Sequence, residues 1–209
     1  MVFNRKMTMR DTNSGIRKML AVLEDKELEL LFDEEMGVSY VAKDPYAAKS
    51  PDIIQCLSYW DSLRGDRLAP AWHEFNWLKF PVEIIPYCGV IDIKRDPLDF
   101  IYRFWGTAHA TTMSQEMTGK SVRDMMPESE GKSVYDQYLE TLKSEKPRLF
   151  VNTICTNTLG TELTEVSLRL PFSDSGEQID HILAFSDMRQ DLKDFETAFY
   201  EAMSRKSHG

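Results

Sequence analysis

Cysteine is scarce in this sequence of 209 residues, with three copies at Cys56, Cys88 and Cys155. They are too few and too far apart for a disulfide framework, and none lies beside a second cysteine at the spacing of a zinc site. Buried free thiols are the simplest interpretation. We therefore expect a cytoplasmic protein that folds in a reducing compartment without a cysteine-bound metal.

Positive charge is also in deficit, because 25 Lys and Arg residues stand against 34 Asp and Glu residues, for a formal net charge of -9. Such a field repels phosphate backbones and anionic lipid head groups, so nucleic acid is not an expected partner. No window approaches the apolar length of a membrane span. Residues 1–10 carry cations with no apolar stretch behind them, so we expect neither a secretory signal nor membrane insertion.

Recognisable catalytic motifs are missing as well. The sequence contains no glycine-rich phosphate loop and no Gly-x-Ser-x-Gly phrase. Its histidines are isolated from one another and from any pair of cysteines, so we expect no structural metal. We assign no catalytic residue from these patterns and expect no resident cofactor.

The composition that remains, 42% hydrophobic, 11% aromatic and 28% charged residues, is typical of a soluble globular chain. In its first third, apolar residues recur at helical spacing, and a stripe that begins at Ile16 predicts a helical extension within residues 1–50. Ser50 and Pro51 suit the cap and first turn of a further helix, which ends near Gly65.

After Pro86 the apolar period changes to two residues, which indicates β-strands. Strands are predicted over residues 90–94 and 98–105, joined by a tight turn at Arg95-Asp96-Pro97. A symmetric hairpin sets Asp92 opposite Arg103. On one face it places Ile91, Ile93, Phe100, Tyr102 and Phe104, and on the other Val90, Asp92, Arg103 and Trp105.

The remaining elements are helical turns between residues 107 and 126, a helix over 129–144, strands over 148–157, 162–172 and 179–187, and a closing helix from about 189. Within the middle strand, Val166, Leu168 and Leu170 alternate with Ser167 and Arg169. Such alternation is typical of a strand with one buried face.

Several phrases of the sequence resemble a known family. They are Trp60-Asp61-Ser62-Leu63-Arg64-Gly65-Asp66-Arg67-Leu68-Ala69-Pro70, Ile91-Asp92-Ile93, Phe100-Ile101-Tyr102-Arg103-Phe104-Trp105-Gly106-Thr107, Met117-Thr118-Gly119-Lys120-Ser121 and Leu170-Pro171-Phe172-Ser173-Asp174. With the order of the predicted elements, they resemble the PAS-like sensor family found mainly in alphaproteobacteria and formerly catalogued as a domain of unknown function. The resemblance covers about residues 53–189.

This resemblance implies an α+β fold with a PAS-like five-stranded antiparallel sheet and helices on one face. We expect an N-terminal helical extension over residues 1–50, a PAS-like domain with its leading helix over 51–189, and a C-terminal helix over 190–209. Members of the wider superfamily sense small molecules, light or redox state, or mediate dimerisation. The resemblance therefore implies a non-enzymatic sensory or regulatory homodimer that binds an apolar or mixed-polarity metabolite, a signalling protein, or both.

A ligand pocket between the sheet and the helices would be lined by the aromatic residues of the second predicted strand. Asp92 and Arg103 could anchor a charged ligand, although a cross-strand ion pair is the simpler interpretation. His109 could ligate a haem iron, but a packed histidine is favoured. The candidate pocket residues are Asp92, Tyr102, Arg103, Phe104, Trp105 and His109.

A second interpretation belongs to another functional class. In a small α+β cone-shaped isomerase or dehydratase, a curved sheet and helices enclose an apolar cavity where an Asp and a Tyr or His transfer protons. Asp92, Tyr102 and His109 are then the acid–base candidates. Enzymes of this kind usually open with long helices and end in long strands, whereas a helix is predicted to close this chain, which favours the sensor.

Overall fold

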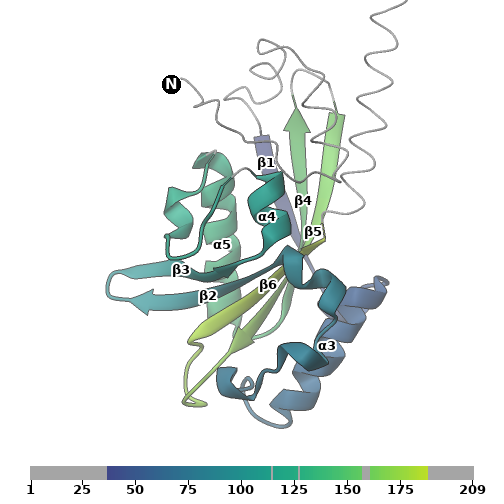
Figure 1. Cartoon of the computed structure of the whole chain (residues 1–209), viewed down its shortest axis with the longest axis vertical. Coiled ribbons are helices and arrows are strands. Elements are labelled where there is room, and N and C mark those ends of the chain that lie inside the picture. Colours follow the sequence, from purple (N-terminus) through teal and green to yellow (C-terminus); the bar gives the residue numbers. More distant parts are fainter. Residues whose placement is uncertain (1–36, 114, 127, 157–160, 188–209) are drawn as a thin grey trace, which may run out of the picture.

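The computed structural model describes residues 37–113, 115–126, 128–156 and 161–187. The helices predicted within residues 16–36 and after residue 189 lie outside this part. An antiparallel sheet of six strands runs through it in the order β1-β4-β5-β6-β2-β3, with helices packed against the sheet (Figure 1). The predicted α+β class is therefore confirmed.

The strands are β1 (Gly37–Lys43), β2 (Cys88–Arg95), β3 (Leu98–Trp105), β4 (Arg148–Thr156), β5 (Thr161–Phe172) and β6 (His181–Asp187). The α-helices are α3 (Pro51–Arg64), α4 (Thr107–Thr112) and α5 (Glu128–Ser144). Short 3-10 helices occur at η1 (Pro45–Ala47), η2 (Trp72–Glu74), η3 (Trp77–Lys79), η4 (Val82–Tyr87) and η5 (Val122–Asp124). None of the helices described is long and apolar enough to cross a bilayer.

Strand β1 is an addition to the five strands that the sequence predicts. It lies within the segment expected to be a helical extension, and it pairs with β4 along its whole length. Its Tyr40 ring packs edge-on against Phe150 of β4, with ring centroids 5.4 Å apart. The open edge of β4 supplies hydrogen-bond partners that a helix in this position would leave unused.

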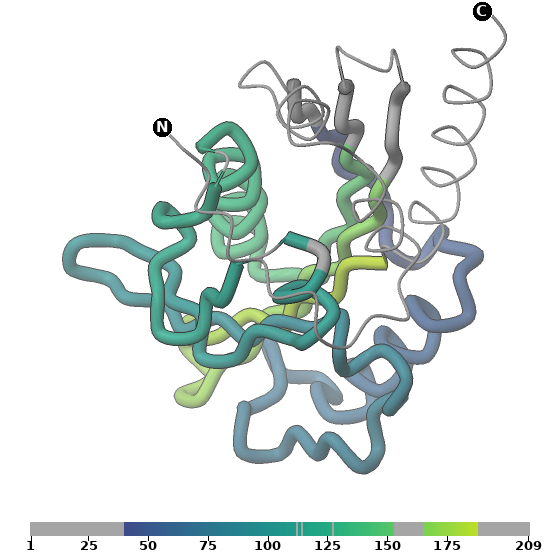
Figure 2. Tube along the Cα trace, turned by 45° about the horizontal axis from the view of Figure 1, so that its top comes forward, coloured from purple at the N-terminus to yellow at the C-terminus, as the bar shows by residue number. Residues whose placement is uncertain are grey.

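Helices cover both faces of the sheet, whereas the resemblance implied one. On the face that we call the α3 face, α3 and the connector of residues 65–87 pack over a core that includes Leu168 and Leu170. On the opposite face, the α5 face, α4, η5 and α5 pack over a core that includes Ile91 and Ile182. Figure 2 shows the blue connector and α3 below the sheet and the green α5 above it.

Strands β2 and β3 form the predicted hairpin, but its register differs from the prediction. Arg95 pairs with Leu98 across the turn, so Asp92 lies opposite Ile101 and not opposite Arg103. A bulge follows farther from the turn. Arg103 is the extra residue, because its neighbours Tyr102 and Phe104 pair with consecutive residues of β2. An extra residue in one strand inverts the alternation of faces beyond it.

The bulge explains why two aromatic side chains lie on faces opposite to those expected. Phe104 lies on the α3 face, where its ring centroid is 5.6 Å from that of Trp77. Trp105 lies on the α5 face, 4.7 Å from the ring of Tyr102. A symmetric hairpin predicted the reverse for both, because it left no room for an extra residue at Arg103.

Gly106 closes β3 and caps α4 at a point where two backbones meet. Its N–H donates to the carbonyl of Cys88 at 2.9 Å. A Cβ added to Gly106 would lie 2.2 Å from the carbonyl oxygen of Pro86 and 2.7 Å from that of Cys88. Backbone atoms cannot rotate away as a side chain can, so only glycine fits here.

Gly106→Ala should therefore lower the free energy of unfolding by about 3 kcal/mol or more, the upper end of the range for overpacking. Gly119→Ala is the matched control: its φ is 81° but its Cβ would meet open space, so the loss should be about 1–2 kcal/mol. Urea denaturation of both variants measures the difference. Equal losses would show that the approach at Gly106 is not rigid.

Candidate functional site

The inward side of α5 is unusually polar for a helix packed on a sheet. Its buried residues include Ser133, Gln137 and Thr141, which lie four residues apart and share one stripe of the helix. Tyr138 is the large buried side chain next to them. Thr141 donates its hydroxyl to the carbonyl of Gln137 within the helix, and Ser133 Oγ has no partner, so Gln137 is the residue of this stripe whose amide needs polar groups on the sheet.

The α5 face of the sheet supplies those groups. Asn152 of β4, Ser167 and Arg169 of β5, and Ser186 of β6 are buried polar residues. Arg169 is only 3% exposed although its side chain is always charged. Together with Gln137 of α5, these residues form what we call the Arg169 network.

The principal hydrogen-bond chain of the Arg169 network begins at the guanidinium of Arg169 and ends at Glu165. Arg169 Nη2 donates to Gln137 Oε1 at 3.0 Å, and Gln137 Nε2 donates to Asn152 Oδ1 at 2.7 Å. Asn152 Nδ2 donates to Ser167 Oγ at 3.2 Å, and that hydroxyl donates to Glu165 Oε1 at 2.6 Å. Because arginine only donates, it fixes the orientation of both amides. The chain ends on a carboxylate.

Arg169 nevertheless keeps donor capacity that the protein does not use. Its Nη1 lies 3.5 Å from Ser186 Oγ, while its buried Nε–H has no hydrogen-bond partner. None of the ion pairs found among the described residues includes Arg169. Burial of a charge without a direct counter-charge is unfavourable for stability. Such a group points to a role in binding.

Aromatic side chains border the Arg169 network. The ring of Tyr138 lies 5.1 Å from the guanidinium carbon of Arg169, and its hydroxyl lies 3.0 Å from that of Tyr102. Burial raises the pKa of both tyrosines, so both stay neutral at physiological pH. Their hydroxyls act as hydrogen-bonding groups and not as bases.

His109 of α4 lies at the end of this aromatic row. Its ring packs against Trp105 at 4.4 Å between centroids. Burial lowers the pKa of His109 to about 4, although its hydrogen bond to the Tyr87 carbonyl favours the charged form. The neutral ring must donate from Nε2 to that carbonyl, at 2.8 Å. Its Nδ1 is then an acceptor, buried and without a partner.

Two carboxyl groups complete the surroundings. Burial, with a further contribution from the negative charge of Glu165, raises the pKa of Glu130 to about 8. Glu130 is therefore protonated at neutral pH, and Glu165 is left as the carboxylate that receives the chain from Arg169. One cation and one anion thus remain at the site.

The candidate pocket residues divide between the two faces of the sheet. Tyr102, Trp105 and His109 lie on the α5 face beside the Arg169 network. Those on the α3 face are Asp92, Arg103 and Phe104. The acid–base trio of the enzyme interpretation, which required Asp92 beside Tyr102 and His109, is therefore not assembled.

Asp92 and Arg103 form the ion pair that was the simpler interpretation. The Nη2 and Nε atoms of Arg103 lie 2.8 and 3.1 Å from the two oxygens of Asp92. The side chains are 41% and 39% exposed, so the pair contributes at most about 1 kcal/mol. His181 bridges Asp92 and Asp174 at 2.9 Å each, and this hydrogen bond lowers the pKa of Asp174. The cluster ties β2 and β6 to the loop between β5 and β6.

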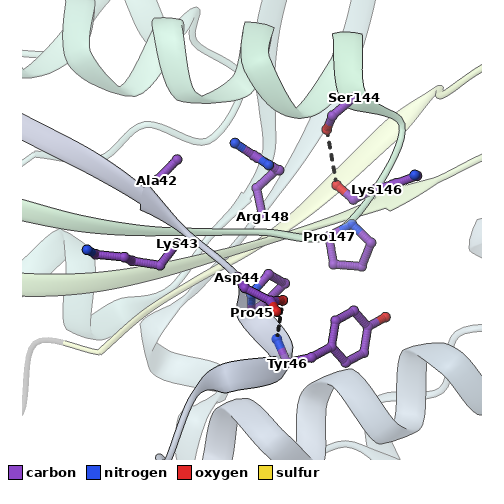
Figure 3. A pocket seen from close by; sticks show the side chains of 9 residues that line it. All are labelled: Ala42, Lys43, Asp44, Pro45, Tyr46, Ser144, Lys146, Pro147 and Arg148. Atoms are coloured by element: carbon purple, nitrogen blue, oxygen red, sulfur yellow. Dashed lines mark hydrogen bonds between the residues drawn. The ribbon is translucent and has the colours of Figure 1, made fainter.

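A separate pocket of about 440 Å³ lies where β1 and η1 meet the turn between α5 and β4. Lys43, Lys146 and Arg148 line it, but their side chains point in different directions (Figure 3). Arg148 also pairs with Glu140 of α5. Cations that diverge do not converge on one anion, so this pocket lacks the geometry of an anion site.

The sequence analysis missed Gln137, Asn152 and Arg169 as site residues. Two signals were present. Ser133, Gln137 and Thr141 recur at helical spacing within the predicted helix, and Ser167 and Arg169 alternate with apolar residues in the predicted strand. Both patterns are those of solvent-facing surfaces, and only the packing of one against the other makes them a site.

No family model matches the chain, and no curated protein matches it. Among solved structures, the chain described as "Structure of an RNA-binding Light-Oxygen-Voltage Receptor" is similar, with a TM-score of 0.37 and 10% sequence identity. The similarity covers 83% of the present chain and 44% of that chain, so the present chain spans less than half of that receptor's length. A similarity this distant does not indicate what the present chain binds.

The unfavourable burial of Arg169 can be measured. Arg169→Met should change the free energy of unfolding by less than about 2 kcal/mol, because removal of a buried charge offsets the loss of the donor to Gln137 Oε1. Leu168→Ala, its neighbour on the α3 face, should lower it by about 2–5 kcal/mol. Chemical denaturation compares the two. An equal loss in Arg169→Met would mark Arg169 as a structural residue.

Glu130 should make stability depend on pH. Its pKa rises from 4.5 to about 8 on folding, so this group stabilises the fold fully below pH 4.5, progressively less as pH rises, and not at all above about pH 8. His109 has the opposite effect below pH 6.5, because its pKa falls on folding. Between pH 6.5 and about 8, Glu130→Gln should therefore flatten the decline in the free energy of unfolding.

Glu128→Gln provides the control for this measurement, since Glu128 is exposed on the same helix. Its stability profile should fall with pH as the wild-type profile does. The same decline in Glu130→Gln as in wild type would contradict the protonated state of Glu130.

Proposed function

We propose that this protein is a PAS-like sensory or regulatory module that binds a small molecule between α5 and the sheet. The observation that carries this proposal is the buried guanidinium of Arg169, whose Nε–H has no acceptor. A buried charged donor without a partner is strongly destabilising unless something supplies the acceptor. A bound ligand with an acceptor group would do so.

The contacts among the resembling phrases support the PAS-like assignment. The indole N–H of Trp60, in the first phrase, donates to the carbonyl of Pro171, in the last, at 2.7 Å. The N–H of Tyr102, in the third, donates to the carbonyl of Lys120, in the fourth, at 3.0 Å. Gly119 N–H donates back to the Tyr102 carbonyl at 2.7 Å. The phrases thus contain the residues that join distant elements of the fold.

The arrangement suits a binding-driven change of state. The Arg169 network joins α5 to three strands, so a ligand at Arg169 would act on the contact between helix and sheet. A ligand that binds one packing of α5 more tightly than another shifts the population toward that packing. The module would then offer a changed surface to a signalling protein, as a homodimer associated through its helices.

The enzyme alternative has less support. Asp92 lies on the α3 face in an ion pair, and burial keeps Tyr102 neutral. His109 is neutral with its Nε2–H donated to a backbone carbonyl. Acid–base catalysis needs groups that exchange protons near the working pH at one reacting centre. We therefore favour binding over turnover.

Native mass spectrometry after incubation with a metabolite extract tests the proposal. The wild-type protein should retain a small molecule that Arg169→Met loses. Arg123→Met is the matched control, because Arg123 is an exposed arginine near α5 and should not affect retention. After denaturation releases the compound, the protein should return to its unmodified mass. Retention of nothing by the wild type would contradict ligand binding, and conversion of a compound that stops in His109→Ala would favour the enzyme.

A further inference from the structure

Two unpartnered buried atoms of opposite polarity lie at the site. Arg169 Nε is a donor on a permanent cation, and His109 Nδ1 is an acceptor on a neutral ring. We infer that the ligand is a small aromatic acid that carries a hydroxyl group, with its carboxylate at Arg169 and its hydroxyl at His109. This inference rests on the proposed function and names the class of its ligand.

The charge at the site selects a single negative group. Arg169 is the cation of the network, and Gln137 and Ser186 occupy only part of its donor set. A guanidinium binds a carboxylate through paired N–H donors, with charge-assisted hydrogen bonds. Glu165 already carries one negative charge at the far end of the chain. With Glu165 counted, a monocarboxylate leaves one negative charge without a cation and a doubly charged anion leaves two, so the smaller charge is favoured.

The histidine selects a donor. His109 Nε2 donates to the carbonyl of Tyr87 at 2.8 Å, which leaves Nδ1 with a lone pair and no hydrogen. Burial keeps the ring neutral, because it lowers the pKa to about 4. A hydroxyl group satisfies Nδ1 without bringing a second positive charge near Arg169. A purely apolar acid leaves Nδ1 unpaired.

An unbroken row of rings connects the two atoms. Tyr138 lies against the guanidinium of Arg169 at 5.1 Å, and its ring is 6.3 Å from that of Tyr102. Trp105 lies 4.7 Å from the ring of Tyr102 and 4.4 Å from that of His109. Aromatic edges and faces favour another planar ring in contact with them. The body of the ligand is therefore aromatic.

Calorimetric titration with 2-, 3- and 4-hydroxybenzoate is the direct test, because the three isomers place the hydroxyl at different distances from the carboxylate. At least one isomer should bind the wild-type protein. Its matched hydroxybenzamide, which lacks the charge, and benzoate, which lacks the hydroxyl, should each bind about tenfold or more weakly. Absence of binding by all three acids at millimolar concentration overturns the inference, as does equal affinity for acid and amide.

Two substitutions test the two contacts separately. Arg169→Lys keeps the charge but loses the planar fork, and it should weaken binding of the acid by about tenfold or more. His109→Phe should remove the preference for the hydroxybenzoate over benzoate. A ratio of two ligands is insensitive to the fraction of folded protein. An unchanged ratio in His109→Phe would show that the hydroxyl does not lie at His109.

The failures of the two proposals are distinguishable. If the metabolite extract yields a ligand that depends on Arg169 but no hydroxybenzoate binds, ligand binding stands and the ligand class is wrong. If neither binds, both are wrong, and the unpartnered atoms are satisfied by ordered water. Proton–deuterium exchange at the His109 ring should then be the same with and without each acid, as expected if ordered water satisfies these atoms.

Discussion

A permanently charged guanidinium held away from water determines how the α5 side of this protein is built. Arg169 can only donate hydrogen bonds, so each neighbour must present an acceptor toward it. Gln137 does so with its carbonyl, which turns its amide toward Asn152 and sets the direction of the chain to Glu165. Within the polar stripe of α5, Gln137 is the residue that meets this requirement. The apolar core of the α3 face, where Trp60 anchors α3 to the backbone of β5, supplies the compensating stability.

Much of the fold follows from periodicity. The strand predicted over residues 98–105 is β3, and the helix begun by Pro51 is α3, which ends before Gly65 at a positive φ. The bulge at Arg103 could not be predicted, because the apolar alternation continues through it and the shift arises only from pairing with β2. Strand β1 was missed for a related reason, since its partner β4 lies more than a hundred residues away.

The site was harder to predict than the fold because its residues have the sequence pattern of solvent-exposed residues. Ser167 and Arg169 alternate with Leu168 and Leu170, as in a strand with one wet face, and a strand covered on both sides normally reads as continuously apolar. Here α5 brings its own polar stripe, so two polar surfaces bury each other. Tyr102 and Trp105 could be nominated because aromatic residues concentrate on the second predicted strand, and His109 because it is the histidine of the helical segment that follows. Their companions Gln137 and Asn152 belong to elements that meet only in three dimensions.

The bulge at Arg103 also bears on how this sequence can change over time. Because one surplus residue separates Tyr102 from Phe104, β3 sends Arg103 and Phe104 to one layer and Tyr102 and Trp105 to the other. Loss of a single residue there would barely shorten the hairpin. It would nevertheless move the side chains at the end of β3 to the opposite faces of the sheet. Insertions and deletions in this short stretch should therefore be tolerated far less than substitutions. The exposed ion pair on one face and the aromatic row on the other would have to be inherited as one unit.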